Sequence, residues 1–477
     1  MDTIGLGGNM NKKKQFAKTT LIIFFGKVCT QLISFFLLPL YTAYLATSEY
    51  GIVDLIQTYV TLFVPIITME LEMSIFRFLI DSRGKDKDIK TLISHNFYVL
   101  GISLTLFTIL FFIVTSFVDI PFRFVIWIDV IVCVLSGNFL QIARGFGQTL
   151  DFSISCILTG LTTVISNIVL ICFCGMQAEG MIISMALANF ICSLYLFIRL
   201  KLFSKIDFKL VNKPLLKEMY KYSIPLVPNG ISWWIVNVSD RTIVSFVLGA
   251  SFNGLYAISN KFPTIISSLT GIFNLSWSES ASLHINSPDR DEFFSDIANT
   301  IMKLFVALGV GMIACMPFVF PIMINKKYDG AYAYIPPLVL ATVFNVAICL
   351  YSQIYLAKKM SKQVASTTIM GAIINIIINI VFIKYIGLYA AAISTTIAYF
   401  VMFIYRHFDL KKYVNIQYEK GFFLKSFLIF VFALFLYYYN HFYTNLFSLI
   451  VVCIYAFLTN KEFLQKSFLT IKNKIKH

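Results

Sequence analysis

The chain has 477 residues, of which 58% are hydrophobic and only 13% charged, and its mean hydropathy is +0.79. A soluble globular protein carries roughly 25% charged residues, and this sequence has no polar stretch long enough for a separate soluble domain. The formal net charge of +15 is spread over short loops and the tail, which argues against nucleic acid as a partner and is typical of charges that meet membrane lipid.

Apolar stretches recur along the chain, each long enough for a helix to cross a hydrocarbon layer about 30 Å thick. We therefore predict an all-α polytopic membrane protein with about fourteen transmembrane helices. The first apolar stretch is too long for a signal-peptide core and lacks an A-x-A-like cleavage site, so we expect it to be retained; Met10 is an alternative translation start to Met1. The predicted spans are 19–46, 52–78, 93–117, 122–143, 152–174, 179–198, 222–248, 254–280, 297–324, 332–357, 364–384, 387–405, 424–440 and 443–459.

Basic residues gather in every second gap between the spans. With the N-terminus inside, 32 of the 39 Lys and Arg residues lie on the cytoplasmic side, four lie outside and three lie within spans. Because cytoplasmic loops are enriched in Lys and Arg, this asymmetry predicts that both termini are cytoplasmic.

The longest predicted cytoplasmic loop divides the chain into two similar halves. Asn167-Ile168-Val169 in the first half is matched by Asn379-Ile380-Val381 in the second, and Gly51, which opens span two, is matched by Gly254, which opens span eight. Transporters are often built from such repeats, with the substrate path between them. The predicted parts are a cytoplasmic tail (1–18), an N-lobe of six helices (19–198), a basic linker on the inner leaflet (199–221), a C-lobe of six helices (222–406), two further helices (407–460) and a basic tail (461–477).

The sequence contains no recognisable catalytic or metal-binding pattern. It has no HExxH, GxSxG or Walker motif, its nine cysteines form no CxxC pair, and its loops are short. These absences predict a transporter rather than an enzyme, without a cofactor or bound metal.

Three cations within the spans are the candidate substrate-binding residues. Lys27 lies in span one, and Arg241 and Lys261 lie at matching depth in spans seven and eight. An ionisable side chain within a span is costly and usually faces a cavity or a partner, and Arg holds phosphate oxygens well. Two alternatives stay open: Lys27 extends back to the inner headgroups, or an Asp240–Lys261 salt bridge joins spans seven and eight.

Four further charged residues are functional candidates. Glu70, in the inner half of span two, and Asp240 are candidates for binding a coupling proton or ion, because a buried carboxylate takes up protons readily. Arg77 and Arg144, at the inner ends of spans two and four, are candidates for a cytoplasmic gate.

Several segments resemble one known family. Residues 239–249 (SDRTIVSFVLG) resemble the SDRxIIxxFLG segment of polysaccharide-export flippases, and residues 254–263 (GLYAISNKFP) resemble the GxYSxAxKxP segment that follows it. Residues 273–281 (FNLSWSESA) are similar to FNxAWxPxA, with Glu279 in place of the usual proline. Residues 39–51 resemble PLYTRxLxxxEYG, and residues 143–145 match the ARG motif.

These motifs identify the chain as similar to the Wzx-like oligosaccharide-lipid flippases of the multidrug/oligosaccharidyl-lipid/polysaccharide (MOP) exporter superfamily. The resemblance implies two six-helix lobes in a V, as in the MATE transporters, two extra C-terminal helices, and a cationic cavity that alternates between the membrane faces. The family's basic cavity positions correspond to Lys27, Arg241 and Lys261.

The resemblance also implies a cargo and a cellular setting. The implied cargo is an undecaprenyl-diphosphate-linked oligosaccharide, a repeat unit of O-antigen, capsule or exopolysaccharide, whose lipid tail stays in the membrane along spans thirteen and fourteen. The coupling ion would be H+ or Na+, and glycosyltransferases and a polymerase of the pathway are expected partners. The protein would lie in the bacterial plasma membrane.

Three alternatives remain at the level of the sequence. A multidrug cation antiporter of the same superfamily would favour an acidic cavity, which the excess of cations at Arg241 and Lys261 disfavours. A membrane-embedded polysaccharide polymerase would need a larger outer loop than any in this chain. Another lipid cargo, such as the peptidoglycan precursor, is compatible with the same cations.

Overall fold

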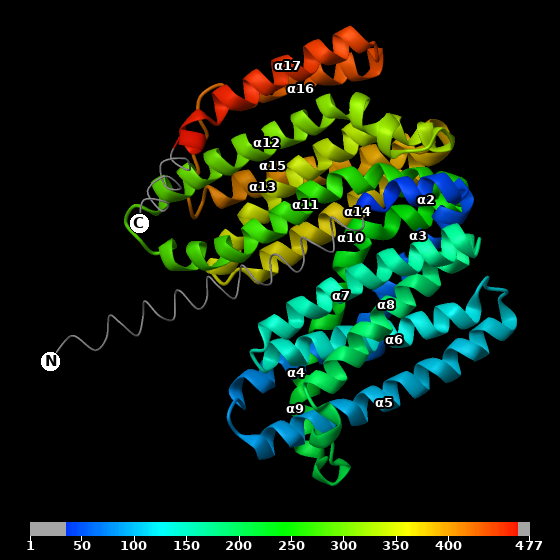
Figure 1. Ribbon diagram of the computed structural model, residues 1–477. Helices are drawn as coiled ribbons and strands as arrows, with labels where there is room; N and C mark the ends of the chain where they lie inside the picture. Colours follow the sequence, from blue (N-terminus) through cyan, green and yellow to red (C-terminus); the bar gives the residue numbers. More distant parts are fainter. Residues whose placement is uncertain (1–34, 466–477) are drawn as a thin grey trace, which may run out of the picture. The chain divides into compact units, whose positions relative to one another are not determined.

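The computed structural model describes residues 35–465, so Lys27 lies outside the described residues. This range is built of helices and contains no strand, as Figure 1 shows. The chain divides into two compact units. The first comprises residues 52–234 with the segment that ends at Leu45, and the second comprises residues 46–51 with the chain from Ile235 onward.

The hydrophobic core of the first unit lies between α4, α5, α6 and α8. Its largest core cluster joins Leu71 and Ile75 of α4, Phe139 and Ile142 of α6, and Leu196 of α8. Its elements are α2 (Leu38–Tyr44), α3 (Thr47–Thr68), α4 (Leu71–Asp81), α5 (Asp86–Phe117), α6 (Arg123–Gly145), α7 (Thr149–Asn167), the π-helical η1 (Ile168–Phe173), α8 (Gln177–Arg199), η2 (Leu202–Lys205), η3 (Phe208–Leu210), α9 (Lys213–Ser223) and the start of α10 (Leu226–Val247).

The basic linker is fastened to the first unit. Asn212 caps α9 by accepting a hydrogen bond from the Leu215 amide (3.0 Å), which satisfies one of the free amides at the helix start. The Ser74 hydroxyl of α4 donates to the Met219 carbonyl (3.2 Å), and the His95 ring of α5 contacts the backbone of Asn212. Met219 of α9 also belongs to the core cluster of the first unit, with Leu215 and Leu216 packed against it, and a place for this linker at the inner leaflet stays a prediction.

The second unit is built around α13, the most deeply buried long helix of the described chain. α13 packs against α11, α12, α14 and α15, and the C-terminal pair α16 and α17 packs against α12. The elements are the end of α10, then α11 (Ala250–His284), α12 (Arg290–Met323), η4 (Lys326–Tyr334), α13 (Ile335–Ala357), α14 (Ser361–Ile386), α15 (Tyr389–Leu410), α16 (Phe422–Tyr439) and α17 (Phe442–Thr459).

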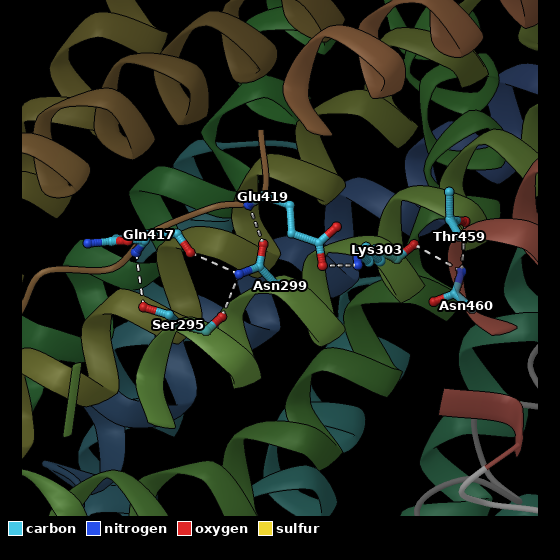
Figure 2. A network of polar contacts seen from close by, with 7 residues as sticks. All are labelled: Ser295, Asn299, Lys303, Gln417, Glu419, Thr459 and Asn460. Carbon is cyan, nitrogen blue, oxygen red and sulfur yellow. Dashed lines mark hydrogen bonds and ion pairs between the residues drawn. The ribbon is translucent and has the colours of Figure 1, made fainter. Parts of the chain in front are cut away.

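A polar network fastens the segment before α16 to α12 (Figure 2). The Asn299 side chain of α12 donates to the Gln417 carbonyl (2.9 Å) and accepts from the Glu419 amide (3.0 Å). One turn further on, Lys303 forms an ion pair with Glu419, and the Asn460 amide group at the end of α17 reaches the Lys303 carbonyl. This network ties the two C-terminal helices to the N-terminal half of α12, and the Tyr437 and Tyr438 hydroxyls of α16 donate to the carbonyls of η4, which follows the other end of α12.

Arg406 is buried inside the second unit, although the sequence groups it with the basic residues of the inner loops. Its side chain is 1% exposed. Its guanidinium donates to the Thr367 hydroxyl of α14 and to the Ile348 carbonyl of α13 at 2.7–3.0 Å. Arg406 therefore joins three helices, α13, α14 and α15, through neutral acceptors.

The predicted class, an all-α polytopic membrane protein, is confirmed. Eleven helices of the described chain are long and apolar enough to cross a membrane. α10 and α11, the predicted spans seven and eight, are not among these eleven. The predicted span 52–78 is interrupted, because α3 ends at Thr68 and α4 begins at Leu71.

The two matched glycines of the sequence repeat lie against each other within the second unit. A Cβ atom on Gly254 would lie 2.0 Å from the Thr47 carbonyl oxygen, and one on Gly51 would lie 1.9 Å from the Ala250 carbonyl oxygen. Real Cβ atoms do not approach backbone this closely, so each position accepts glycine alone without movement of the backbone. The absence of side chains lets residues 47–51 approach α11 closely.

Gly254→Ala should destabilise the protein, because the added methyl group must push two backbones apart, and overpacking of this kind costs about 1–3 kcal/mol. The matched control is Gly271→Ala on the same helix, where a Cβ meets nothing within 4 Å and alanine favours the helix. Thermal unfolding of the two purified variants, followed by intrinsic fluorescence, should show a lower midpoint for Gly254→Ala alone. Equal midpoints would refute the close approach.

Candidate functional site

A buried carboxylate in the second unit is held by side chains from three other helices. Asp240 of α10 is 4% exposed. Its Oδ2 accepts hydrogen bonds from the Tyr256 hydroxyl of α11 (3.0 Å) and the Thr395 hydroxyl of α15 (2.6 Å). Its Oδ1 accepts from the Asn379 amide group of α14 (2.9 Å). All these donors are neutral, so the charge of Asp240 is met by dipoles, and an ion pair with Lys261 is not among its contacts in the described chain.

Oxygen atoms without partners lie beside this carboxylate. Asn375 stands one turn before Asn379 on α14, and its amide group donates to the Thr395 hydroxyl (3.0 Å). The side-chain oxygens of Asn375 and Asn379 are both buried and both lack a hydrogen-bond partner. An unpartnered buried oxygen is costly, so this pair of oxygens is available to a further donor or to a cation.

The chemistry of this cluster suits a monovalent hard cation or a proton. It offers one carboxylate together with amide and hydroxyl oxygens, the ligands that hard cations prefer. No group of three or more His, Cys, Asp or Glu side chains placed to hold a metal ion occurs within the described residues, and a single carboxylate is a modest charge for a divalent ion. We name Asp240, Asn375, Asn379 and Thr395 the Asp240 cluster.

Sequence reasoning found only one member of the Asp240 cluster as a functional candidate. In the sequence, Asn379 stands out only as part of the repeat, and nothing there assigns a role to Asn375 or Thr395. A signal was present: the two asparagines are four residues apart in an apolar span, which places both amides on one helix face. A polar pair of that spacing within a span predicts an interhelical contact, although not which helix it meets.

The two predicted substrate cations lie in the same unit as the Asp240 cluster. Arg241 follows Asp240 on α10, and Lys261 lies on α11, and both side chains are partly buried and engaged in interactions. Arg241 acts electrostatically on Tyr256, the residue that donates to Asp240. α10 and α11 therefore bring Arg241 close to the cluster, while Lys261 lies more than one turn beyond Tyr256.

Glu70 lies at the break between α3 and α4. Met69 and Glu70 both have positive φ, 51° and 55°, in the left-handed region that non-glycine residues seldom adopt. The Glu70 amide reaches back to the Pro65 carbonyl (3.2 Å), and the Glu70 carbonyl accepts from the Met73 amide (3.0 Å). The two helices are thus joined by a tight turn rather than by disordered chain. Breaks of this kind inside membrane helices often line binding sites.

The two candidate gate residues have partners within the first unit. Arg77 of α4 forms an exposed ion pair with Asp81 one turn later (2.6 Å). Arg144 of α6 donates to Gln141 (2.9 Å), and its guanidinium lies 4.7 Å from the ring centre of Phe76. The structure places both on neighbouring helices, and the gate role stays a prediction.

The sequence was compared with known families and curated proteins. The profile of a family described as "Polysaccharide biosynthesis protein" matches residues 16–277, more than half of the chain. This range includes Glu70, Asp240, Arg241 and Lys261. No curated protein sequence matches the chain.

Solved transporter structures share the fold. The lipid II flippase MurJ in an inward closed conformation superposes with a TM-score of 0.69 at 16% identity, over 94% of this chain and 100% of that one. An inward-facing multidrug resistance MATE family transporter of the MOP superfamily gives 0.64 at 13% identity, over 80% and 95%. A MOP superfamily transporter from Pyrococcus furiosus, whose binding pocket is described as reversed in polarity, gives 0.56 at 12% identity, over 84% and 96%.

The turn between α3 and α4 yields a test with two methionines. Met69→Gly should stabilise the protein by up to about 1 kcal/mol, because glycine adopts positive φ without steric cost. Met73→Gly should destabilise it by about 1 kcal/mol, because Met73 lies within α4. Both side chains are similarly exposed, 41% and 38%. Shifts of opposite sign in the thermal unfolding midpoint are expected, and shifts of the same sign would refute the left-handed turn.

Proposed function

Because its sequence matches the family over residues 16–277, the chain belongs to the polysaccharide biosynthesis protein family, and we propose that it flips undecaprenyl-diphosphate-linked oligosaccharides across the bacterial plasma membrane. The products would serve surface polysaccharide assembly, as O-antigen, capsule or exopolysaccharide. The family match is the observation that carries this proposal, and the MurJ-like and MATE-like fold agrees with it.

The diphosphate of the cargo would be bound by basic residues within the spans. Arg241 and Lys261 lie on successive helices of the second unit and supply two positive charges, which matches the charge of a diphosphate diester. Lys27 would add a third. Because Arg presents several donors in one plane, Arg241 is suited to hold phosphate oxygens on two sides.

The lipid tail would lie along an apolar groove of the second unit. This groove has a volume of about 730 Å³ and is formed by α12, α13, α15 and α16. Val310, Phe344, Phe400 and Phe427 are among the side chains that line it. A prenyl chain in this groove would exchange contacts with lipid tails for contacts with protein, so close packing rather than the hydrophobic effect would hold it there.

The Asp240 cluster would bind the coupling cation, Na+ or H+. Asp240 supplies the charge, and rotation of the Asn379 amide would exchange its donated hydrogen bond for an oxygen ligand. Since the cluster joins α10, α14 and α15, and Tyr256 of α11 donates to it, occupancy by a cation would alter how these helices pack. A cation gradient could in this way bias the alternation of the transporter between the membrane faces.

Lipid II, the cargo of the flippase MurJ, is the second candidate substrate. The full-length superposition on MurJ favours it, and it carries the same diphosphate-linked lipid chemistry. The family match to polysaccharide biosynthesis favours the first candidate. The two differ in phenotype: failure to flip lipid II stops cell-wall synthesis and growth, whereas failure to flip a polysaccharide unit removes surface polysaccharide.

Arg241→Ala and Lys261→Ala should each abolish surface polysaccharide, because each removes a charge that offsets the diphosphate. The measurement is surface polysaccharide in cells that carry the substitution in their own gene, with the protein level checked by immunoblot. Lys384→Ala, at the exposed last turn of α14, is the matched control and should export normally. Normal export by both test variants at normal protein level would overturn the proposed anion site.

Asp240→Asn should abolish stabilisation by the coupling cation. A ligand present at 100 times its Kd stabilises a folded protein by about 2.7 kcal/mol, so the unfolding midpoint of the wild type should rise when sodium replaces choline. Asp119→Asn changes an exposed carboxylate in the loop between α5 and α6 and should retain the response. A sodium response that survives in Asp240→Asn would contradict binding at this cluster, and a wild type that responds to acid instead of sodium would assign the cluster to protons.

A further inference from the structure

The first unit contains its own buried carboxyl group, which none of the proposals above uses. Asp129 of α6 is 1% exposed. Its Oδ2 accepts a hydrogen bond from the Gln57 amide group of α3 (2.8 Å). Its Oδ1 is buried and has no hydrogen-bond partner.

The surroundings of Asp129 are neutral and apolar. The adjacent turns of α6 contribute Ile126 and Val130 to a hydrophobic cluster with Val60 of α3, against which Phe107 of α5 packs. From α8, the neutral Asn189 faces the carboxyl group. No cation lies among the partners of Asp129 within the described residues.

An ionised carboxylate in such a place would pay a large desolvation cost that the neutral amides of Gln57 and Asn189 offset only in part. The neutral acid avoids that cost. A protonated carboxyl group also explains why the two oxygens of Asp129 differ in hydrogen bonding. The carbonyl oxygen accepts from Gln57, and the hydroxyl oxygen needs no donor. Asp129 lies six residues after the start of α6 at Arg123, roughly 9 Å along the helix.

A second observation extends the site along the first unit. The Cys133 thiol, one turn after Asp129 on α6, lies close enough to Asp129 and to Glu72 of α4 to be acted on by both charges. Glu72 in turn acts on Glu70. One carboxylate oxygen of Glu72 is also buried without a partner. The first unit therefore contains three carboxyl groups of this kind, Asp129 on α6 and Glu70 and Glu72 at the turn between α3 and α4.

We propose that Asp129 is a proton-binding site of the first unit, and that Glu72 and Glu70 connect it to the break between α3 and α4. The proton binds to Oδ1 of the Asp129 carboxylate and leaves as H+, so no other reactant is needed. Glu70 is half-buried at the break and is the member of the series that exchanges protons with water. The neutral Cys133 thiol is acted on by both Asp129 and Glu72 and adds no charge between them.

The proton-binding step is independent of the cargo and of the Asp240 cluster. Only the consequence of proton binding rests on the proposed function: a proton bound at Asp129 in each transport cycle would be a second driving ion. A metal ion is a poor occupant, because Asp129 has one carboxylate and an amide that donates toward it. The infrared absorption of protonated carboxyl groups detects the site directly, without transport and without a substrate.

The experiment is infrared spectroscopy of the purified full-length protein in lipid nanodiscs, in H2O and D2O at pH 5. The wild type should show the C=O band of a buried, protonated carboxyl group. Asp129→Asn should lose that component, and Asp119→Asn, the exposed carboxylate, should keep it. Asp240→Asn identifies any separate component from the second unit. A spectrum of Asp129→Asn identical to that of the wild type would overturn the proposal.

Two further variants keep the test decisive if Asp129→Asn does not fold. Gln57→Leu removes the donor to Oδ2 and should shift the C=O frequency of the same component, because carbonyl frequency depends on hydrogen bonding. Glu70→Gln should leave the band in place and slow its exchange into D2O by several-fold, since the outlet of the series is lost. An unshifted band in Gln57→Leu would count against the assignment of the band to Asp129. Unchanged exchange in Glu70→Gln would count against the proton path through Glu70. Normal polysaccharide export by Arg241→Ala and Lys261→Ala would contradict the proposed cargo site and would leave the proton site at Asp129 unaffected.

Discussion

The low dielectric constant of the membrane interior governs the placement of the charged residues of this protein. Outside water, a charge must be paired, surrounded by oriented dipoles or removed by protonation. Each solution occurs here at a different residue. Arg406 is surrounded by hydroxyl and carbonyl oxygens of three helices, Asp240 by hydroxyl and amide donors, and Asp129 has so few donors that the neutral acid is favoured.

These arrangements also hold the helices together. Helices in lipid gain little from the hydrophobic effect when they associate, so polar contacts and close packing decide which helices pair. Asp240 connects α10 to α11, α14 and α15, and Asn299 connects α12 to the segment before α16. Gly51 and Gly254 act without polar atoms, because the missing side chains let two backbones meet. In a transporter built in this way, the helices can repack when an ion binds at one of these polar contacts.

The two asparagines that the predicted repeat matches are buried alike but have different hydrogen-bond partners. Asn167 and Asn379, matched by the repeat, are both fully buried. Asn379 donates to a carboxylate on another helix, whereas Asn167 donates to the Thr163 carbonyl of its own helix. The carboxyl group of the first half instead lies on α6 at Asp129. We infer that the repeat preserved helix packing, while the ionisable groups were placed separately in each unit.

The sequence by itself determined the class of the protein and most of its helices. Apolar length predicts the spans, because each must satisfy its backbone hydrogen bonds internally within the membrane, and the basic residues of alternate loops predict the topology. The motifs at residues 239–263 predict the family that the sequence comparison then shows. Arg241, Lys261, Glu70 and Asp240 were recognised as candidates because a charge inside an apolar span is visible without any structure.

Only the tertiary structure decided which residues share a site. Hydropathy predicts one apolar span over 52–78, and the break at Met69 and Glu70 depends on two backbone torsions that composition does not encode. Asn375, Asn379 and Thr395 are separated from Asp240 by more than 130 residues, so their convergence depends on how three helices, α10, α14 and α15, pack. Local sequence fixes the length and polarity of a helix, because these depend on the residues of that helix alone. The contacts of its polar face depend on distant residues, and therefore on the fold.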